Sequence, residues 1–172
     1  MASNIIIRVR CEPYLIRFLE TLYGGSPISF PKNSNFNAIL DVFLDKPPLG
    51  HHDPDHGENT LAIQLPYFEL KDIRSYNYLT ETKQRIFIKE IWKFFKITYR
   101  QDIAKCVVMG LDRKDAIELF IEKYDLPLDC WDSLEKDFQR YLKLRSKKRL
   151  FKNNISSAVK DHDCPAVSMC GN

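Results

Sequence analysis

The densest group of potential metal ligands is His51-His52-Asp53-Pro54-Asp55-His56, which carries three imidazoles and two carboxylates within six residues. These side chains ligate zinc and other divalent ions, so the stretch could support a metal-dependent hydrolase. However, structural metal sites usually place their ligands on two scaffolded elements, and no HExxH spacing is present. The neighbouring Pro47-Pro48, Gly50 and Gly57 are typical of an exposed loop. We therefore expect a flexible loop with weak affinity for metals, and no cofactor.

The sequence lacks the residue patterns that usually indicate nucleophilic catalysis or nucleotide binding. The four histidines lie in this loop and in the C-terminal tail, where a base is poorly held against a Ser or Cys nucleophile. Gly24-Gly25 is not followed by the GK[ST] of a phosphate-binding loop, and no GxGxxG is present. We expect a protein that is not an enzyme.

Several features indicate a cytoplasmic protein that binds no membrane. The five cysteines are widely spaced without a CxxC pair, which is typical of reduced thiols. No apolar run approaches the roughly 18 residues that a membrane span needs. Arg8 and Arg10 stand where a signal peptide would be apolar.

Charge is distributed unevenly along the chain. The formal net charge is +3, yet residues 138–152 carry seven basic side chains and no acidic one. Such a block beside a mildly acidic body is typical of a surface that binds phosphates or other anions, because electrostatic steering depends on the local field. The alternative is a solvated helix end without a ligand.

The basic block falls on a helix that is predicted to begin at Asp129 or Asp132 and to end at about Phe151. Leu134, Phe138 and Tyr141 share one face, and that buried face is expected to end near Leu144. Arg140, Lys143 and Lys147 lie within about 40° of Lys136 on the opposite face, at 100° per residue. The residues expected to contact nucleic acid are Lys136, Arg140, Lys143, Arg145, Lys147, Lys148 and Arg149.

A helix over 112–124, a turn at Pro127 and this basic helix follow the layout of helix-turn-helix DNA binders. The connection from Asp125 to Trp131 is longer than the usual turn. We expect a protein that binds nucleic acid, with double-stranded DNA as the ligand. The alternative is a non-enzymatic structural or adaptor protein that uses the same helix, together with the aromatic segment 67–78, against a protein partner.

Alternating apolar residues predict a strand over 5–11 and a second strand over 61–65. Two short helices are expected between them: one after Pro13, and one capped by Ser34 or Asn35. A strand followed by two helices is similar to ribbon-helix-helix repressors, whose strands pair between subunits. Pairing with the 61–65 strand of the same chain is the favoured interpretation.

The second half of the chain is predicted to be helical. Helices are expected over about 80–95, with Ile88, Ile91, Trp92 and Phe95 facing inward, and over about 98–109. The helix over 112–124 is expected to bury Ala116, Leu119, Phe120 and Tyr124. The fold class is therefore α+β and mostly helical, with a small N-terminal antiparallel sheet and a four-helix C-terminal part that ends in a long basic helix.

The whole is expected to form a single mixed domain over 1–152. It comprises a strand and helix part over 5–65 and a helical part over 80–152. The polar residues 153–172 are expected to be a disordered tail.

Tyr67-Phe68 and Tyr76-Asn77-Tyr78, interleaved with Lys71 and Arg74, could form a base-stacking platform. Closure of the core over a junction is the favoured interpretation of these aromatic residues. Together with Asp115-Ala116-Ile117-Glu118 and the stretch 124–141, residues 65–79 resemble small uncharacterised proteins of bacterial prophages and other mobile elements. The resemblance implies a bacterial cytoplasmic setting and DNA transactions, and it assigns no catalytic residue.

Overall fold

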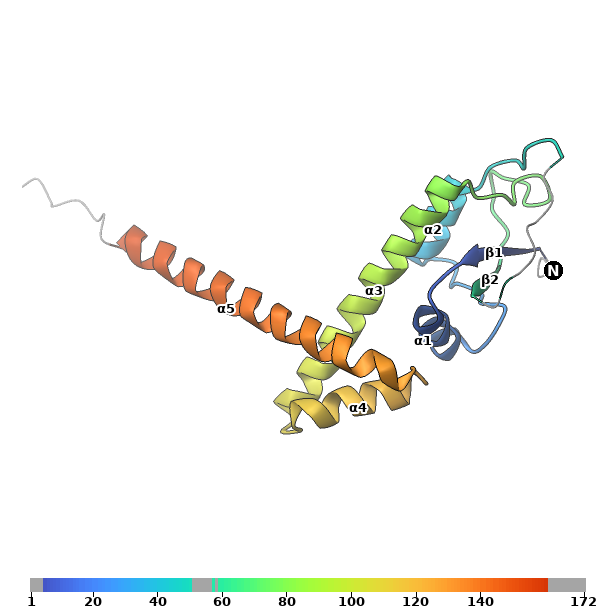
Figure 1. Cartoon of the computed structure of the whole chain (residues 1–172). Coiled ribbons are helices and arrows are strands. Elements are labelled where there is room, and N and C mark those ends of the chain that lie inside the picture. The colour runs from blue at the N-terminus through green and yellow to red at the C-terminus, as the bar shows by residue number, and fades with distance from the viewer. Residues whose placement is uncertain (1–4, 51–56, 58, 161–172) are drawn as a thin grey trace, which may run out of the picture. The chain divides into compact units, whose positions relative to one another are not determined.

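The computed structural model describes residues 5–50, 57 and 59–160, and it describes side chains as far as residue 146. The chain forms two compact units, Met1–Trp131 and Asp132–Asn172. The boundary lies at the start of the last helix, whereas the sequence analysis treats residues 1–152 as one domain. The fold class is confirmed: the structure is α+β and mostly helical, with a two-stranded antiparallel sheet near the N-terminus (Figure 1).

The sheet pairs β1 (Ile6–Arg10) with β2 (Thr60–Gln64), and Ile7 lies opposite Ile63 in the register. Alternate β1 side chains are buried, as the period of two predicts. Ile28 extends the sheet beyond β2 through a single parallel bridge, in which its backbone N–H donates to the carbonyl of Ala62 at 2.8 Å. Pairing within the chain, rather than as in ribbon-helix-helix proteins, is confirmed.

Two short helices stand between the strands in the sequence. α1 (Pro13–Tyr23) begins with a proline. Backbone N–H groups in the first turn of a helix have no acceptor within the helix, so the missing N–H of proline costs nothing there. The helix ends at Gly24, which has a φ of 88°. α2 (Asn35–Phe43) is capped by Ser34, whose hydroxyl accepts a hydrogen bond from the backbone N–H of Asn37. Both helices contact α3 (Glu81–Val108), and Figure 1 shows α2 beside the first half of that helix.

α3 corrects one prediction, because it is a single helix where two helices were expected. Its segment contains no proline or glycine, so nothing in the backbone interrupts it near Phe95 or Thr98. The Thr98 hydroxyl donates to the carbonyl of Phe94 within the helix, at 3.0 Å. Between residues 80 and 160, the structure therefore contains three α-helices rather than the four expected: α3, α4 (Arg113–Lys123) and α5 (Trp131–Lys160), with a short 3₁₀ turn, η1 (Leu128–Cys130).

The buried line of α3 also differs from the predicted one. Trp92 was expected to face inward, but its side chain is 39% exposed. Five residues at a constant spacing of four are buried instead: Phe87, Ile91, Phe95, Tyr99 and Ile103. A spacing of four advances about 40° at each step, so this line winds around the helix.

The buried residues of α3 contact different parts of the protein along the length of the helix. The Phe87 ring packs near Phe36, with ring centroids 6.0 Å apart, and Tyr99 lies 6.1 Å from Phe120 of α4. α4 accordingly buries Ala116, Ile117, Phe120 and Ile121. Leu119 was expected to be buried but is 46% exposed, because the face that includes Ile117 and Ile121 packs inward instead.

Candidate nucleic-acid interface

The candidate interface lies on α5, which runs from Trp131 to Lys160. The predicted end near Phe151 is wrong, and residues 153–160 are helical rather than part of a disordered tail. No proline or glycine occurs within the helix, so the backbone can continue. Residues 161–172, the rest of the expected tail, lie outside the described residues.

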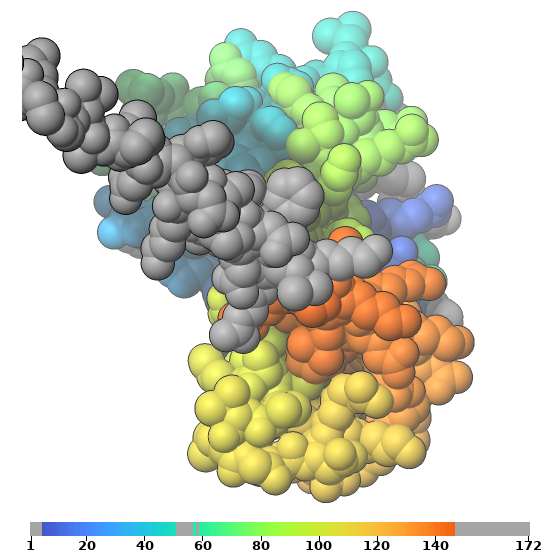
Figure 2. Space-filling model, turned by 90° about the vertical axis from the view of Figure 1, so that its left-hand side faces the viewer, coloured from blue at the N-terminus to red at the C-terminus, as the bar shows by residue number. Residues whose placement is uncertain are grey.

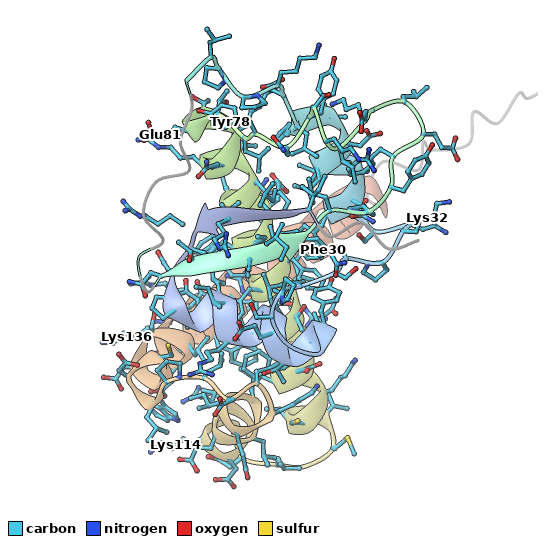
Figure 3. The ribbon with its side chains drawn as sticks, turned by 90° about the vertical axis from the view of Figure 1, so that its right-hand side faces the viewer. Phe30, Lys32, Tyr78, Glu81, Lys114 and Lys136 are labelled. Atoms are coloured by element: carbon cyan, nitrogen blue, oxygen red, sulfur yellow. The ribbon has the colours of Figure 1, made fainter. Side chains whose placement is uncertain are left out.

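Four of the seven predicted contact residues have described side chains, and all four are exposed: Lys136, Arg140, Lys143 and Arg145. Figure 3 shows Lys136 near the start of α5. The helical spacing places Lys136, Arg140 and Lys143 on one face, as predicted, whereas Arg145 is about 180° away from Lys136. The side chains of Lys147, Lys148 and Arg149 lie outside the described residues.

Some cations elsewhere in the described chain are held in ion pairs, whereas others, such as Lys32 and Lys89, are exposed without one. Arg85 lies 2.6 Å from Glu81, Lys93 lies 2.6 Å from Glu90, and Lys123 lies 2.8 Å from Asp102. Among the described residues, no carboxylate forms an ion pair with Lys136, Arg140, Lys143 or Arg145. The basic side chains of α5 therefore keep their charge available for an external anion.

The opposite face of α5 is apolar at its beginning. Leu134 and Phe138 are buried, and the rings of Phe138 and Tyr141 lie 5.9 Å apart. Tyr141 is half-buried and Arg145, the next residue along this face, is exposed, which agrees with the expected end of the buried face near Leu144. Leu142 and Leu144 are 41% and 61% exposed. On the helical wheel, Leu144 lies about 60–120° from Leu134, Phe138 and Tyr141, whereas Leu142 lies only about 40° from Phe138.

The connection between α4 and α5 contains the turn that Pro127 predicts. Asp125 has a φ of 49°, and the backbone N–H of Leu126 donates to the carbonyl of Ile121, which closes the end of α4. η1 then leads into α5. The connection therefore exceeds the turn of three to four residues that helix-turn-helix motifs use.

The aromatic segment 67–78 is anchored to α2. Phe68 is buried, whereas Tyr67 is 73% exposed. The Lys71 ammonium donates to backbone carbonyls at the end of α2, and it lies 5.9 Å from the centre of the Tyr76 ring. These contacts favour core closure over a base-stacking platform with a free cation.

The remaining candidates for chemistry stay separate. The loop His51–His56 lies outside the described residues, so its metal affinity stays a prediction. Elsewhere in the described chain, no three His, Cys, Asp or Glu residues are grouped as a metal would require. Burial raises the pKa of the Cys11 thiol to about 12, which leaves it protonated and unreactive near neutral pH.

Sequence reasoning missed a cavity of about 610 Å³ where β1 ends and α1 begins. Its lining includes Arg10, Cys11, Glu12, Asn59, Thr60 and Ile88. These residues come from three distant parts of the chain, and no local sequence pattern brings them together.

Comparisons of the chain with protein-family models, with curated proteins and with solved structures found no match. The resemblance of residues 65–79 to proteins of mobile elements therefore stays a prediction. In the part of the chain that the structure describes, no helix combines the length and apolar character needed to cross a membrane.

Proposed function

We propose that the protein binds nucleic acid, with double-stranded DNA as the ligand, through the basic side chains of α5. The observation that carries this proposal is the set of exposed cations on α5 that have no acidic partner among the described residues. Phosphate oxygens are the counter-charge that such a set fits, because each neutralised phosphate releases condensed counterions.

The geometry of the helix suits a phosphate backbone. Lys136, Arg140 and Lys143 share one face, and at 1.5 Å per residue they span about 10 Å along the helix axis. Long Lys and Arg side chains on such a line can reach successive phosphates at the edge of a groove. Along the chain, α4 is followed by a turn and then by the basic helix α5. We therefore propose that α4 and α5 form a helix-turn-helix-like unit, although their connection is longer than in that motif.

A duplex is favoured over a single strand by the placement of the aromatic residues. Single-strand binding combines a cationic groove with aromatic side chains on which bases stack. On α5, the described aromatic residues after Trp131 are Phe138 and Tyr141, which lie opposite the cationic face and contact each other. An α-helix also fits the major groove of B-form DNA.

A second function is favoured by a separate observation. Leu142 and Leu144 are exposed beside the cations, and exposed apolar side chains often mark protein-binding surfaces. The second candidate is therefore a structural or adaptor protein that binds a protein partner. In either case, the proposed setting is the bacterial cytoplasm and a mobile element, as the resemblance of residues 65–79 implies.

Fluorescence anisotropy with a random-sequence duplex tests the first proposal. The full chain is compared with a Lys136→Glu/Arg140→Glu/Lys143→Glu variant at several salt concentrations. We expect the full chain to bind with a slope of about −0.9 in log K against log salt for each phosphate neutralised. The variant should lose about a hundredfold or more in affinity at low salt.

A matched control reverses three exposed lysines of the first unit, Lys32→Glu/Lys46→Glu/Lys89→Glu. The control has the same net charge as the α5 variant, so a loss confined to the α5 variant assigns binding to that helix. Absence of binding by the full chain at low salt would contradict the DNA proposal and favour a protein partner.

A further inference from the structure

The outer face of α4 carries three acidic side chains around one exposed leucine. Asp115, Glu118, Leu119 and Glu122 follow the spacing i, i+3, i+4 and i+7, which places them on one side of the helix. All three carboxylates are exposed, and Leu119 is 46% exposed. α4 contributes open surface to the space-filling view, where it is yellow (Figure 2). We call these four residues the acidic face of α4.

This face has no counter-charge among the described residues. None of its carboxylates takes part in an ion pair or hydrogen bond there. The neighbouring Lys123 is held by Asp102, at 2.8 Å, and so is directed to another partner. The inward residues of α4 pack on α3, and the acidic face therefore remains as an unpartnered helix surface.

α5 carries the same pattern with the opposite charge. Arg140, Lys143 and Leu144 follow the spacing i, i+3 and i+4, and Lys147 continues it at i+7. Arg140 and Lys143 are exposed, Leu144 is 61% exposed, and the side chain of Lys147 lies outside the described residues. We call these four positions the basic face of α5.

We propose that the acidic face of α4 binds the basic face of α5 from a second copy of this chain. The two faces match in length, in the position of the leucine and in the spacing of their charges. Their charges are opposite, and complementary charges fix the register of an interface and suppress wrong partners. Each copy offers both faces, so two copies can make the contact twice in one closed, two-fold dimer.

Charge along the sequence favours a second copy, rather than the same chain, as the source of α5. Residues 131–139, which directly follow the short connection after α4, carry three acidic side chains and one lysine. The part of α5 nearest to α4 in the sequence therefore offers no net positive charge, and the basic face begins only at Arg140.

The dimer should be weak and sensitive to salt. Each contact covers about two helical turns, or roughly 10 Å of helix, which is less than a standard stable interface buries. Exposed ion pairs contribute little individually and are screened as the Debye length shortens with added salt. Two reciprocal contacts in one dimer act together, because formation of the first raises the effective concentration for the second.

Dimerisation should compete with DNA binding, an expectation that rests on the proposed function above. Arg140 and Lys143 would serve both the acidic face and phosphates, so duplex DNA should dissociate the dimer. Self-association itself does not depend on DNA, and it can be measured without it.

Sedimentation equilibrium of the full chain at about 20–500 μM, in low and high salt, tests the proposal. We expect dimers at low salt and monomers at high salt. Two charge-reversed chains, Glu118→Lys/Glu122→Lys and Arg140→Glu/Lys143→Glu, should each associate about tenfold or more weakly than the unaltered chain. A Glu69→Lys/Glu81→Lys chain, with the same charge change as the first, should associate as the unaltered chain does.

Mixing the two reversed chains provides the decisive step. In the mixed dimer, both contacts again join opposite charges, so association should return. A chain with all four substitutions should also dimerise, yet it should fail to bind DNA, which separates this inference from the proposed function.

Three results would overturn the proposal. They are a monomer at the highest concentration in low salt, association that persists in either reversed chain, and a mixture that stays monomeric. A further result would also overturn the proposal. If the two double variants are less stable than the unaltered chain, and the fourfold variant regains stability but stays monomeric, the contact lies within one chain.

Discussion

The Nζ atom of Lys71 lies 3.0 Å from the carbonyl oxygen of Leu44, and it also donates to the carbonyl of Asp41. These carbonyls lie at the end of α2, where the last backbone acceptors of a helix have no partner within the helix. The positive ammonium also opposes the partial negative charge at that helix end. Lys71 therefore closes α2 from a segment about 30 residues away in the sequence.

Replacement of Lys71 by methionine keeps the length of the side chain and removes its donors. We expect the Lys71→Met chain to lose about 1–2 kcal/mol of unfolding free energy, measured by urea denaturation, because partly buried carbonyls lose their donor. Lys46→Met is the control, since its ammonium only faces the Tyr76 ring, at 5.3 Å. Unchanged stability together with weakened DNA binding would assign Lys71 to a binding surface instead.

Asn37 is the one buried polar residue among the described side chains, at 3% exposure. Its Nδ2 donates to the carbonyls of Phe30, at 3.2 Å, and of Pro31, at 2.9 Å. Asn37→Ala should lower the unfolding free energy by about 2 kcal/mol, because the Phe30 carbonyl stays buried without this donor and the Pro31 carbonyl keeps only the backbone N–H of Ser34. Asn35→Ala, at an exposed position of the same helix, should cost less. Equal midpoints for the two variants in urea would show that these hydrogen bonds do not stabilise the fold.

Local signals account for the parts of the fold that the sequence predicts correctly. Ser34, one of the two residues expected to cap the second helix, accepts a hydrogen bond from the backbone at the start of α2. Thr80 and Asp112 have the same side-chain chemistry, and they accept such bonds at the start of α3 and α4. Alternation of apolar residues identified β1 and β2 and their pairing. These features depend on neighbours within a few residues, so they can be recognised in one sequence.

Tertiary packing explains what the sequence does not predict. The buried line of α3 winds around the helix because its neighbours change along its length. The prediction from the sequence assumes one fixed inward face that includes Trp92, so it misses this winding. Asn37 is buried because the carbonyls of Phe30 and Pro31 turn toward it, which no residue pattern signals. For the candidate site, periodicity was enough to place Lys136, Arg140 and Lys143 on one face, whereas the exposure of Leu144 depends on what packs near it.

The corrected line of α3 predicts unequal effects of two aromatic substitutions. The Phe95 ring lies 5.0 Å from Phe18 and 6.0 Å from Phe120, whereas Trp92 is 39% exposed. Phe95→Ala should cost about 3–5 kcal/mol of unfolding free energy, because it leaves a cavity among packed rings. Trp92→Ala should cost about half as much, since its surface is already partly hydrated. Equal losses of unfolding free energy in the two variants, measured by thermal or urea unfolding, would instead support the inward-facing line through Trp92 that the sequence predicts.

Cys11 makes the stability of the fold depend on pH in the alkaline range. Burial raises the pKa of its thiol from 9.0 to about 12, so the unfolded chain loses this proton at lower pH than the folded chain does. The contribution of Cys11 is therefore complete below pH 9, and above that it falls by about 1.4 kcal/mol for each pH unit until the folded thiol also ionises. Urea unfolding of the wild-type and Cys11→Ala chains at pH 8 and pH 10 checks this. The wild-type chain should lose more stability over that interval, and parallel losses would show that the Cys11 proton is not linked to folding.

The arrangement of α5 predicts that duplex DNA is preferred over single-stranded DNA of equal length. The described aromatic residues after Trp131 pack against each other on the face opposite Lys136 and Arg140, so they cannot stack on bases while the cations contact phosphates. Tyr141→Ala should therefore leave the affinity for both ligands nearly unchanged, whereas Arg140→Ala should weaken duplex binding and reduce the magnitude of the salt slope by about one. Anisotropy titrations with duplex and single-stranded forms of one sequence measure both effects. A loss of about 1–3 kcal/mol in single-strand binding by Tyr141→Ala would instead indicate base stacking by this helix, because that is the contribution of one stacked base.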